Sequence, residues 1–388
     1  MFARPASRSV LPGRRAKFAN AIAATNAIVV LVAMLLAACS SGKGSNSAKD
    51  VVLVQSIRSL SNPYHAQWVK GGELYAASIG MKVEVLANEG DSQKQLSQIK
   101  SLTASGKTVV ANIDPNTSSD AEALVRAVTD AGGYVVTHWN KPDDLHPWDV
   151  SDHWVAHVTF DGRVGGYNIA KALFAEMGGT GGIIALQGLP DNVVARDRLN
   201  GMTKAMNETP GITLLDQQTG EWDRNKAFQV TQTLLNKHEG KVNGIWAAND
   251  NMALGALEAL KAAGLQGKVP VVGIDAVPEA LKNIQAGDVG YVATQSSDAY
   301  WQGSAALALA RQAATGQYNV GNAPQSDREF YGEQFAINKD NVGRFLTPPT
   351  AADLQDDWQT PLARNQGQIT YQGRWTPTTG VRATRSSP

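Results

Sequence analysis

Residues 51–80 read VVLVQSIRSLSNPYHAQWVKGGELYAASIG and contain the unit on which most of the chain is built. The run VVLVQSI at 51–57 is short, apolar and rich in β-branched residues, which is typical of a buried strand. The segment YHAQWVKGGELYAASIG that follows has the pattern of an amphipathic helix. A buried strand followed by such a helix is the first part of a βαβ unit.

The same alternation continues toward the carboxyl terminus. The helix patterns SQKQLSQIKSLTASG at 92–106 and NMALGALEALKAAG at 251–264 each end in glycine, which favours helix termination. More than seven strand and helix units are too many for one small sheet, so we predict an α/β fold with two doubly wound parallel-sheet domains. The further predicted strands are KVEVLA at 82–87, TVVANI at 108–113, YVVTH at 134–138, GIIALQ at 182–187, GIWAAN at 244–249 and VPVVGI at 269–274.

Composition sets limits on partners and bound groups. A chain of 388 residues is long enough for two domains. Its 35 basic and 35 acidic side chains cancel, which gives no electrostatic argument for a nucleic-acid partner. A single cysteine builds neither a disulfide framework nor a cysteine-rich zinc site within the chain. We expect no metal, no cofactor and no nucleic acid.

Residues 1–38 have the pattern of a secretory signal. Arg14 and Arg15 precede the apolar run AIVVLVAMLLAA at 27–38, which ends in small residues. A retained membrane anchor is the alternative, but this run is shorter than the ~20 residues that a bilayer span needs. The segment Gly13-Arg14-Arg15-Ala16-Lys17-Phe18 is loosely similar to a twin-arginine export signal, so the export route stays open.

The only cysteine follows this signal. The stretch Leu36-Ala37-Ala38-Cys39 resembles the bacterial lipobox, in which the signal is cut before the cysteine and the thiol carries a diacylglycerol. The resemblance implies lipidation of Cys39 and a membrane-anchored protein in the periplasm or at the cell surface. Residues 39–49, rich in Ser, Gly and Lys, are then a flexible tether.

Aromatic and polar residues cluster just after the predicted strands. Ligands of open α/β sheets bind at this carboxyl edge. Indole and phenol rings stack on the C–H faces of a sugar, while amide, carboxylate and guanidinium groups pair with its hydroxyls. The candidate ligand-binding residues are Asn62, Tyr64, His65, Asp114, Trp139, Asn140, Arg196, Trp222, Asn249, Asp275 and Gln295.

Six stretches together carry a resemblance to one family. The chain from about 51 to 346 is similar to periplasmic binding proteins of the ribose-binding-protein type. The stretches are Asn62-Pro63-Tyr64, Asp91-Ser92-Gln93, Asp114-Pro115-Asn116, ALQGLPDNVVARDRLNGM at 185–202, AANDNMALGALEAL at 247–260 and VVGIDAVPEAL at 271–281.

The resemblance implies two similar lobes joined by three crossing segments, a hinge that closes on a ligand. We expect the amino-terminal lobe to hold residues 50–158 and 294–326, and the other lobe 159–293 and 327–346. The polar residues 347–388 lack a helical period and predict an irregular extension.

The resemblance also assigns binding roles to single residues. In the first lobe, Asn62, Tyr64 and His65 fall on the family's first binding loop, and Asp114 falls on a polar binding position. The family's Asp-Arg pair after the fourth strand is replaced here by Trp139-Asn140, which argues against ribose itself.

The resemblance implies five further contacts from the second half of the chain. Arg196 matches the family's sugar-binding arginine, and Trp222 takes the place of a stacking aromatic. Asn249 and Asp275 match residues that fix hydroxyls, while Gln295 falls near the last hinge.

The implied function is the sugar-binding component of an ABC-type importer, a non-enzymatic monomer that binds a neutral monosaccharide or sugar alcohol. Its partners are a membrane permease and the ATPase of that permease. A sensor that presents its ligand to a chemoreceptor or kinase is an alternative, as is a sugar-active enzyme, although no GxSxG, P-loop or GxGxxG motif supports catalysis.

Several of these residues also have plain structural interpretations. Trp139 and Trp222 suit core packing, Arg196 suits a surface ion pair, and Asp250 suits the amino-terminal cap of the helix that follows. The cluster of His138, His146, His153 and His157 has irregular spacing, which disfavours a metal site.

Overall fold

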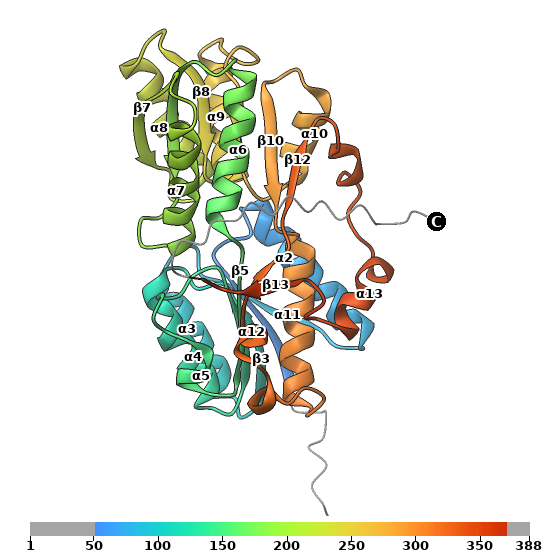
Figure 1. The fold of residues 1–388 in the computed structure, drawn as a ribbon. Helices are drawn as coiled ribbons and strands as arrows, with labels where there is room; N and C mark the ends of the chain where they lie inside the picture. The colour runs from blue at the N-terminus through green and yellow to red at the C-terminus, as the bar shows by residue number, and fades with distance from the viewer. Residues whose placement is uncertain (1–50, 371–388) are drawn as a thin grey trace, which may run out of the picture. The chain divides into compact units, whose positions relative to one another are not determined.

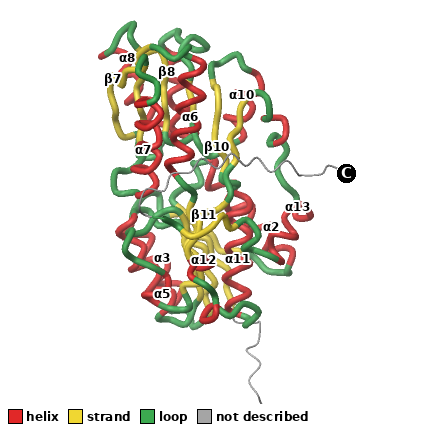
Figure 2. Tube along the Cα trace, in the orientation of Figure 1, coloured by secondary structure: helices red, strands yellow, loops and turns green. Residues whose placement is uncertain are grey.

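The computed structural model describes residues 51–370, which form two sheets covered by helices (Figures 1 and 2). The predicted signal, Cys39 and the predicted tether lie outside the described residues. Within 51–370, no helix has both the length and the apolar character needed to span a membrane.

The first sheet has the strand order β13-β11-β5-β4-β3-β1-β2, and we call it and its helices the first lobe. All neighbouring strands are parallel except β11 and β13, which are antiparallel. Its strands are β1 (Val51–Ile57), β2 (Val83–Ala87), β3 (Thr108–Ile113), β4 (Tyr134–His138), β5 (Trp154–Thr159), β11 (Glu329–Gly332) and β13 (Asn365–Gln368). Its helices are α2 (Pro63–Ser78), α3 (Ser92–Thr103), η3 (Ser118–Asp120), α4 (Ala121–Thr129), α5 (Pro147–Val150), α11 (Ala299–Ala314), η4 (Val320–Asn322), α12 (Gln325–Arg328) and α13 (Ala351–Gln359).

The second sheet has the order β12-β10-β9-β8-β6-β7 and forms the second lobe. Here β12 is antiparallel to β10 and the other pairs are parallel. Its strands are β6 (Gly181–Gln187), β7 (Ile212–Thr219), β8 (Val242–Ala247), β9 (Val271–Val272), β10 (Tyr291–Ser296) and β12 (Phe335–Asn338). Its helices are α6 (Gly162–Glu176), α7 (Val193–Asn207), α8 (Arg224–Lys237), α9 (Asp250–Ala262), α10 (Pro278–Ala286) and η5 (Val342–Arg344).

The predicted two-lobed α/β fold is confirmed, and the reason lies in the near-continuous apolar strands. Val54 of β1, Val110 of β3 and Ile184 of β6 are completely buried, because helices cover both faces of each sheet. The predicted strand at 269–274 is the shortest in the structure, with only Val271–Val272 in ladder geometry.

Glycine lets α2 and α11 approach closely, and this fixes the start of α2 against the first sheet. A Cβ atom on Gly303 would lie 1.8 Å from the Trp68 carbonyl oxygen, and one on Gly71 would lie 2.1 Å from that of Tyr300. The buried Gln55 of β1 donates from its amide to the carbonyl oxygens of both Trp68 and Gly303. One strand and two helices are therefore locked together at this point.

The lobe limits differ from the prediction at two segments. Strand β10 runs to Ser296 within the second sheet, beyond the expected limit at 293. Strand β11 pairs with β5 in the first sheet, whereas residues 327–346 were assigned whole to the second lobe. The buried Glu329 of β11 forms an ion pair with the buried Lys141 at 2.6 Å, which holds this strand in the first lobe.

Residues 347–370 contain a helix and a strand, where the sequence predicts an irregular extension; the rest of the predicted extension lies outside the described residues. Thr350 and Asp353 form a capping box at the start of α13, and Leu354 and Trp358 pack inward one turn apart. The chain then adds β13 to the edge of β11. Within the described part, the chain thus passes between the lobes four times rather than three, the last time between η5 and α13.

Arg364 ties this segment to the start of α11. Its guanidinium forms ion pairs with Asp298 and Asp357, each at 2.7 Å, and lies 5.5 Å from the centre of the Trp301 ring. We expect Arg364→Ala to lower the free energy of unfolding by about 2–3 kcal/mol, because charge-assisted bonds with little solvent exposure are lost. Urea denaturation measures this loss. The exposed Arg344 supplies the control, and an equal effect of Arg344→Ala would contradict the assignment.

Candidate functional site

The first lobe contributes residues from the loops after β1, β3 and β4. Asn62 caps α2 by accepting a hydrogen bond from the Tyr64 amide at 3.0 Å, which places Tyr64 and His65 in the first turn of the helix. His65 Nε2 lies 3.0 Å from Asp114 Oδ2, and both side chains are largely buried. Two buried atoms of this pair, His65 Nδ1 and Asp114 Oδ1, have no hydrogen-bond partner among the described residues.

Tyr64 and Trp139 are joined directly. The Trp139 indole donates from Nε1 to the Tyr64 hydroxyl at 2.6 Å, and that hydroxyl donates to Gln302 Oε1 at 2.8 Å. Burial raises the pKa of the Tyr64 phenol well above its ordinary value. The Tyr64 hydroxyl therefore has both a donor and an acceptor partner within the first lobe.

The second lobe contributes the ends of β8 and β9. Asn249 caps α9 by accepting from the Met252 amide, and its side chain also hydrogen-bonds the Asp275 carboxylate. Asp275 has a positive φ of 130°, a strained conformation for a residue with a Cβ atom, and its amide donates to the Gln295 carbonyl oxygen. Burial raises the pKa of the Asp275 carboxyl well above its ordinary value, against the opposing charge of Arg198.

Arg198 lies at the centre of the site, although it is not among the residues predicted from the sequence. Its guanidinium lies 5.0 Å from the Trp139 ring centre and 5.6 Å from that of Trp222. It donates to the Ala248 carbonyl oxygen at 2.7 Å and lies 3.9 Å from Asp275 Oδ1. One cation from the second lobe is thus stacked between an indole of each lobe.

Arg196, the arginine selected from the sequence, lies away from this centre. Its side chain is 54% exposed and forms an ion pair with Asp143 of the first lobe at 3.1 Å. Helical spacing explains the difference, because Arg198 shares the buried face of α7 with Val194 and Met202. Arg196 therefore forms the surface ion pair that the sequence offered as its structural interpretation, and its contact with a ligand stays a prediction.

Trp222 is linked to the first lobe by two successive hydrogen bonds through Asn192. Its Nε1 donates to Asn192 Oδ1 at 3.0 Å, and the Asn192 amide donates to the Asn116 carbonyl oxygen at 3.3 Å. The neighbouring Val193 amide donates to Ser118 Oγ at 3.1 Å. The start of α7 therefore contacts the first lobe beside the site.

Two other selected residues lie outside this network. Asn140 is buried, and its Oδ1 has no partner among the described residues. The Gln295 side chain accepts from Asn168 of α6 at 3.3 Å and so points toward that helix. The backbone carbonyl oxygen of Gln295 accepts a hydrogen bond from the Asp275 amide at 2.8 Å, so its backbone rather than its side chain contacts this predicted site residue.

Asp250 does not cap α9, contrary to the sequence interpretation, because Asn249 does. The buried Asp250 carboxylate accepts hydrogen bonds from the Tyr291 hydroxyl, the Thr294 hydroxyl and the Val277 amide. Burial raises its pKa to about 6. Asp250 thus joins β10 and the β9–α10 loop behind the site.

The four clustered histidines contact separate neighbours. His146 pairs with Glu329, His153 stacks on Tyr134, and His157 bonds to Thr137. Burial lowers the pKa of His138 to about 3. Among residues 51–370, no three metal-ligating side chains come together in a group.

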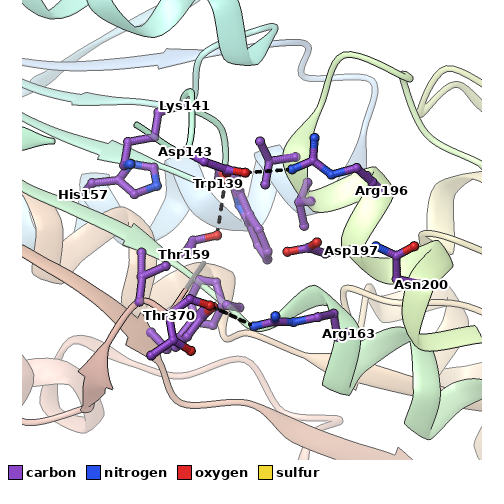
Figure 3. Close-up of a pocket in the computed structure, with 15 residues that line it drawn as sticks. Trp139, Lys141, Asp143, His157, Thr159, Arg163, Arg196, Asp197, Asn200 and Thr370 are labelled. Carbon is purple, nitrogen blue, oxygen red and sulfur yellow. Dashed lines mark hydrogen bonds and ion pairs between the residues drawn. The ribbon is translucent and has the colours of Figure 1, made fainter. Parts of the chain in front are cut away.

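A cavity of about 450 Å³ lies beside the network (Figure 3). Trp139 and Arg196 are the only selected residues among those that line it, with Lys141, Asp143, Arg163 and Asp197 around them. Figure 3 shows Trp139 at the middle of this group, between the Asp143–Arg196 pair and Arg163. The cavity is therefore adjacent to the residue network rather than identical with it.

Two α/β lobes that present aromatic and buried polar side chains to one another define a two-lobed solute-binding protein. The chain belongs to the periplasmic binding protein domain family, which matches residues 54–318.

Similar proteins cover most of the folded part. The D-allose-binding periplasmic protein of Escherichia coli is 32% identical over 243 residues, which are 62% of this chain and 78% of that protein. The ribose import binding protein of Haemophilus influenzae is 30% identical over 257 residues, 66% of this chain and 82% of that one. The solved structure of a twin-arginine translocation pathway signal protein from Burkholderia phytofirmans is 40% identical, with a TM-score of 0.79, and covers 83% of this chain and 99% of its own.

The two arginines of α7 should differ sharply in their effect on stability. We expect Arg198→Ala to lower the free energy of unfolding by about 2–4 kcal/mol, because Asp275 and the Ala248 carbonyl lose a buried partner. Arg196→Ala should change it by less than about 1 kcal/mol, since exposed ion pairs contribute little. Urea denaturation of both variants measures the contrast, and equal losses would refute the assignment of Arg198 as the buried residue.

Proposed function

We propose that this chain is the substrate-binding protein of an ABC-type sugar importer, and that it binds a neutral monosaccharide or sugar alcohol between its lobes. The observation that carries the proposal is the Arg198 guanidinium, stacked between the indoles of Trp139 and Trp222 and flanked by Asp275. This arrangement combines apolar ring faces with fixed donors and acceptors, which is what a polyhydroxylated ring requires.

Buried polar atoms in both lobes suit hydroxyl groups. In the first lobe, His65 Nδ1 and Asp114 Oδ1 have no hydrogen-bond partner among the described residues, and the second lobe adds the buried Asp275 carboxylate. A hydroxyl both donates and accepts, so one sugar ring pairs with all three groups without adding a charge. The names of the relatives above, which specify D-allose and ribose, support a sugar ligand.

Binding and delivery follow from the two-lobe design in our proposal. A ligand that contacts Asp114 and Asp275 at once stabilises the closed arrangement, which shifts the population toward it. The closed protein then presents surfaces of both lobes to a permease and its ATPase. Asp114 and Asp275 each lie beside a fixed partner, His65 or Arg198, and in our proposal they serve binding rather than catalysis.

The Trp139-Asn140 pair leads us to propose a ligand other than ribose. An indole that is already bonded to Tyr64 replaces a charged clamp, so the first lobe offers a ring face where the ribose-type pattern offers an ion pair. A pyranose or a related polyol with a broader apolar face fits this surface better.

We further propose a lipid anchor at Cys39 and a monomeric protein outside the cytoplasmic membrane. The support is the Leu36-Ala37-Ala38-Cys39 stretch and the signal pattern before it. The twin-arginine name of the similar Burkholderia protein agrees with the Arg14-Arg15 pair, and both export routes remain compatible with the proposal.

A thermal-shift panel tests the ligand class. We expect at least one of D-allose, D-ribose, xylitol, myo-inositol and glycerol to raise the melting temperature of the wild-type chain, because a ligand that binds only the folded state stabilises it. If none of these compounds raises the melting temperature and an amino acid does, the fold assignment stands but the sugar assignment is refuted.

Titration calorimetry with the ligand found in this way tests the site. Asp275→Ala should weaken binding by about 30- to 1,000-fold, since buried hydroxyls lose a charged partner worth roughly 2–4 kcal/mol. Asp288→Ala, at an exposed aspartate, and Arg196→Ala should bind normally. Normal binding by Asp275→Ala would place the ligand elsewhere.

Detergent phase separation tests the anchor. In bacterial cells that express the full chain, the wild type should partition into the detergent phase and incorporate labelled fatty acid, whereas Cys39→Ser should do neither, because no other thiol is present. A Cys39→Ser protein that still partitions into detergent would favour the retained membrane anchor over lipidation.

A further inference from the structure

The cavity of about 450 Å³ lies where the chain crosses between the lobes. Thr159 and Phe160, at the first crossing, and Tyr331, just before the third, form part of its wall. Ile369 and Thr370 follow β13 and line it as well, and Arg163 donates to the Thr370 carbonyl oxygen at 3.4 Å. Its volume lies within the range of about 300–1,000 Å³ that is usual for small-molecule sites.

Trp139 is shared by this cavity and the residue network. On one side its indole contacts the Arg198 guanidinium at 5.0 Å and donates to the Tyr64 hydroxyl. On the other it lines the cavity and packs against Phe160, with ring centres 4.8 Å apart. Among the described residues, neither Arg198, Tyr64 nor Asp275 lines the cavity, so the Trp139 indole lies between the cavity and these residues.

The indole is fixed in this position by its backbone and by its polar edge. Trp139 has a φ of 64°, its amide donates to the Val158 carbonyl oxygen at 3.0 Å, and its carbonyl oxygen accepts from Thr159 Oγ1 at 3.3 Å. Rotation of the side chain into the cavity would break the 2.6 Å bond to Tyr64. The ring is therefore a wall rather than a mobile side chain.

We propose that Trp139 determines ligand size: it closes the binding site against the cavity and restricts the ligand to a single ring or a short polyol. The proposal rests on the proposed function. When residue 139 is small, the cavity opens onto the residues around Arg198, and the second ring of a disaccharide enters the cavity. Polar groups already line that space, among them Asp197, Asn200 and Arg163, so a second ring finds hydrogen-bond partners there.

Calorimetry on the full chain tests the proposal with two ligand panels. The first holds D-allose, D-ribose, xylitol, myo-inositol and glycerol, and the second holds maltose, cellobiose, lactose and sucrose. The variants are Trp139→Ala, Trp139→Phe, Asn200→Trp and the double variant Trp139→Ala/Asn200→Trp. Asn200 is an exposed residue that lines the cavity and does not belong to the residue network, so a tryptophan there fills the cavity without touching the site.

The expected result has three parts. The wild type binds a member of the first panel and none of the second. Trp139→Ala binds at least one disaccharide at least tenfold more tightly than the wild type, and the double variant loses this gain. Trp139→Phe, which keeps an aromatic wall, still rejects the disaccharides, and Asn200→Trp alone binds the first-panel ligand within twofold of the wild type.

Two results would overturn the proposal while leaving the proposed function intact. One is a folded Trp139→Ala protein that gains no disaccharide. The other, which applies even if Trp139→Ala fails to fold, is a tenfold loss of first-panel affinity in Asn200→Trp, since the cavity would then be part of the site. If the wild type binds no ligand of either panel, the proposed function itself is refuted, and so is the proposed role of Trp139 in limiting ligand size.

Discussion

A guanidinium removed from water has to be stacked or paired, and Arg198 is both. Its charge faces two indoles and the Asp275 carboxylate, and its remaining hydrogen bond goes to the backbone end of β8. Because Trp139 belongs to the first lobe and Trp222 to the second, this one side chain relates the loops of both sheets. The orientation of Tyr64, through Trp139, and of Asn192, through Trp222, depends on it in turn.

The residues around Arg198 hold unusual backbone conformations. Trp139, Trp222 and Asp275 all have positive φ values, which cost free energy for residues with side chains. Each follows the carboxyl end of a strand or begins a helix connection, where the chain must turn sharply while its side chain points between the lobes. Hydrogen bonds from Trp139 Nε1, Trp222 Nε1 and the Asp275 amide offset that cost. The residues with strained backbone conformations are therefore also residues of the candidate site.

Much of this arrangement was predictable from the sequence, and the misses have physical causes. Apolar strands and glycine-ended helices gave the two sheets, since buried parallel strands leave a plain pattern. Arg198 was missed because an arginine that follows Arg196 and Asp197 looks like part of an exposed charged group, although its spacing to Val194 and Met202 placed it on the buried face of α7. Strand β11 was missed because Glu329 pairs with the distant Lys141, a contact that no local pattern reveals. Helix α13 was missed because the polar composition of the segment hid its two local signals, the Thr350–Asp353 capping box and the spacing of Leu354 to Trp358. Gln295 was predicted to bind the ligand because it lies near a hinge. Its position in the chain did not predict the direction of its side chain, which points toward Asn168 of α6.

The return of the chain to the first lobe after β12 has a consequence for the order of assembly. The second lobe's strands β6 to β10 form one uninterrupted stretch of chain and lack only β12, whereas the first sheet needs β11 and β13 from the far end to complete the edge beyond β5. Contacts between such distant segments form slowly, because a long loop must close before they add any stability. The first sheet therefore begins with the amino-terminal strands but is completed last. Until β11 pairs with β5, the free edge of β5 can pair with strands of other chains.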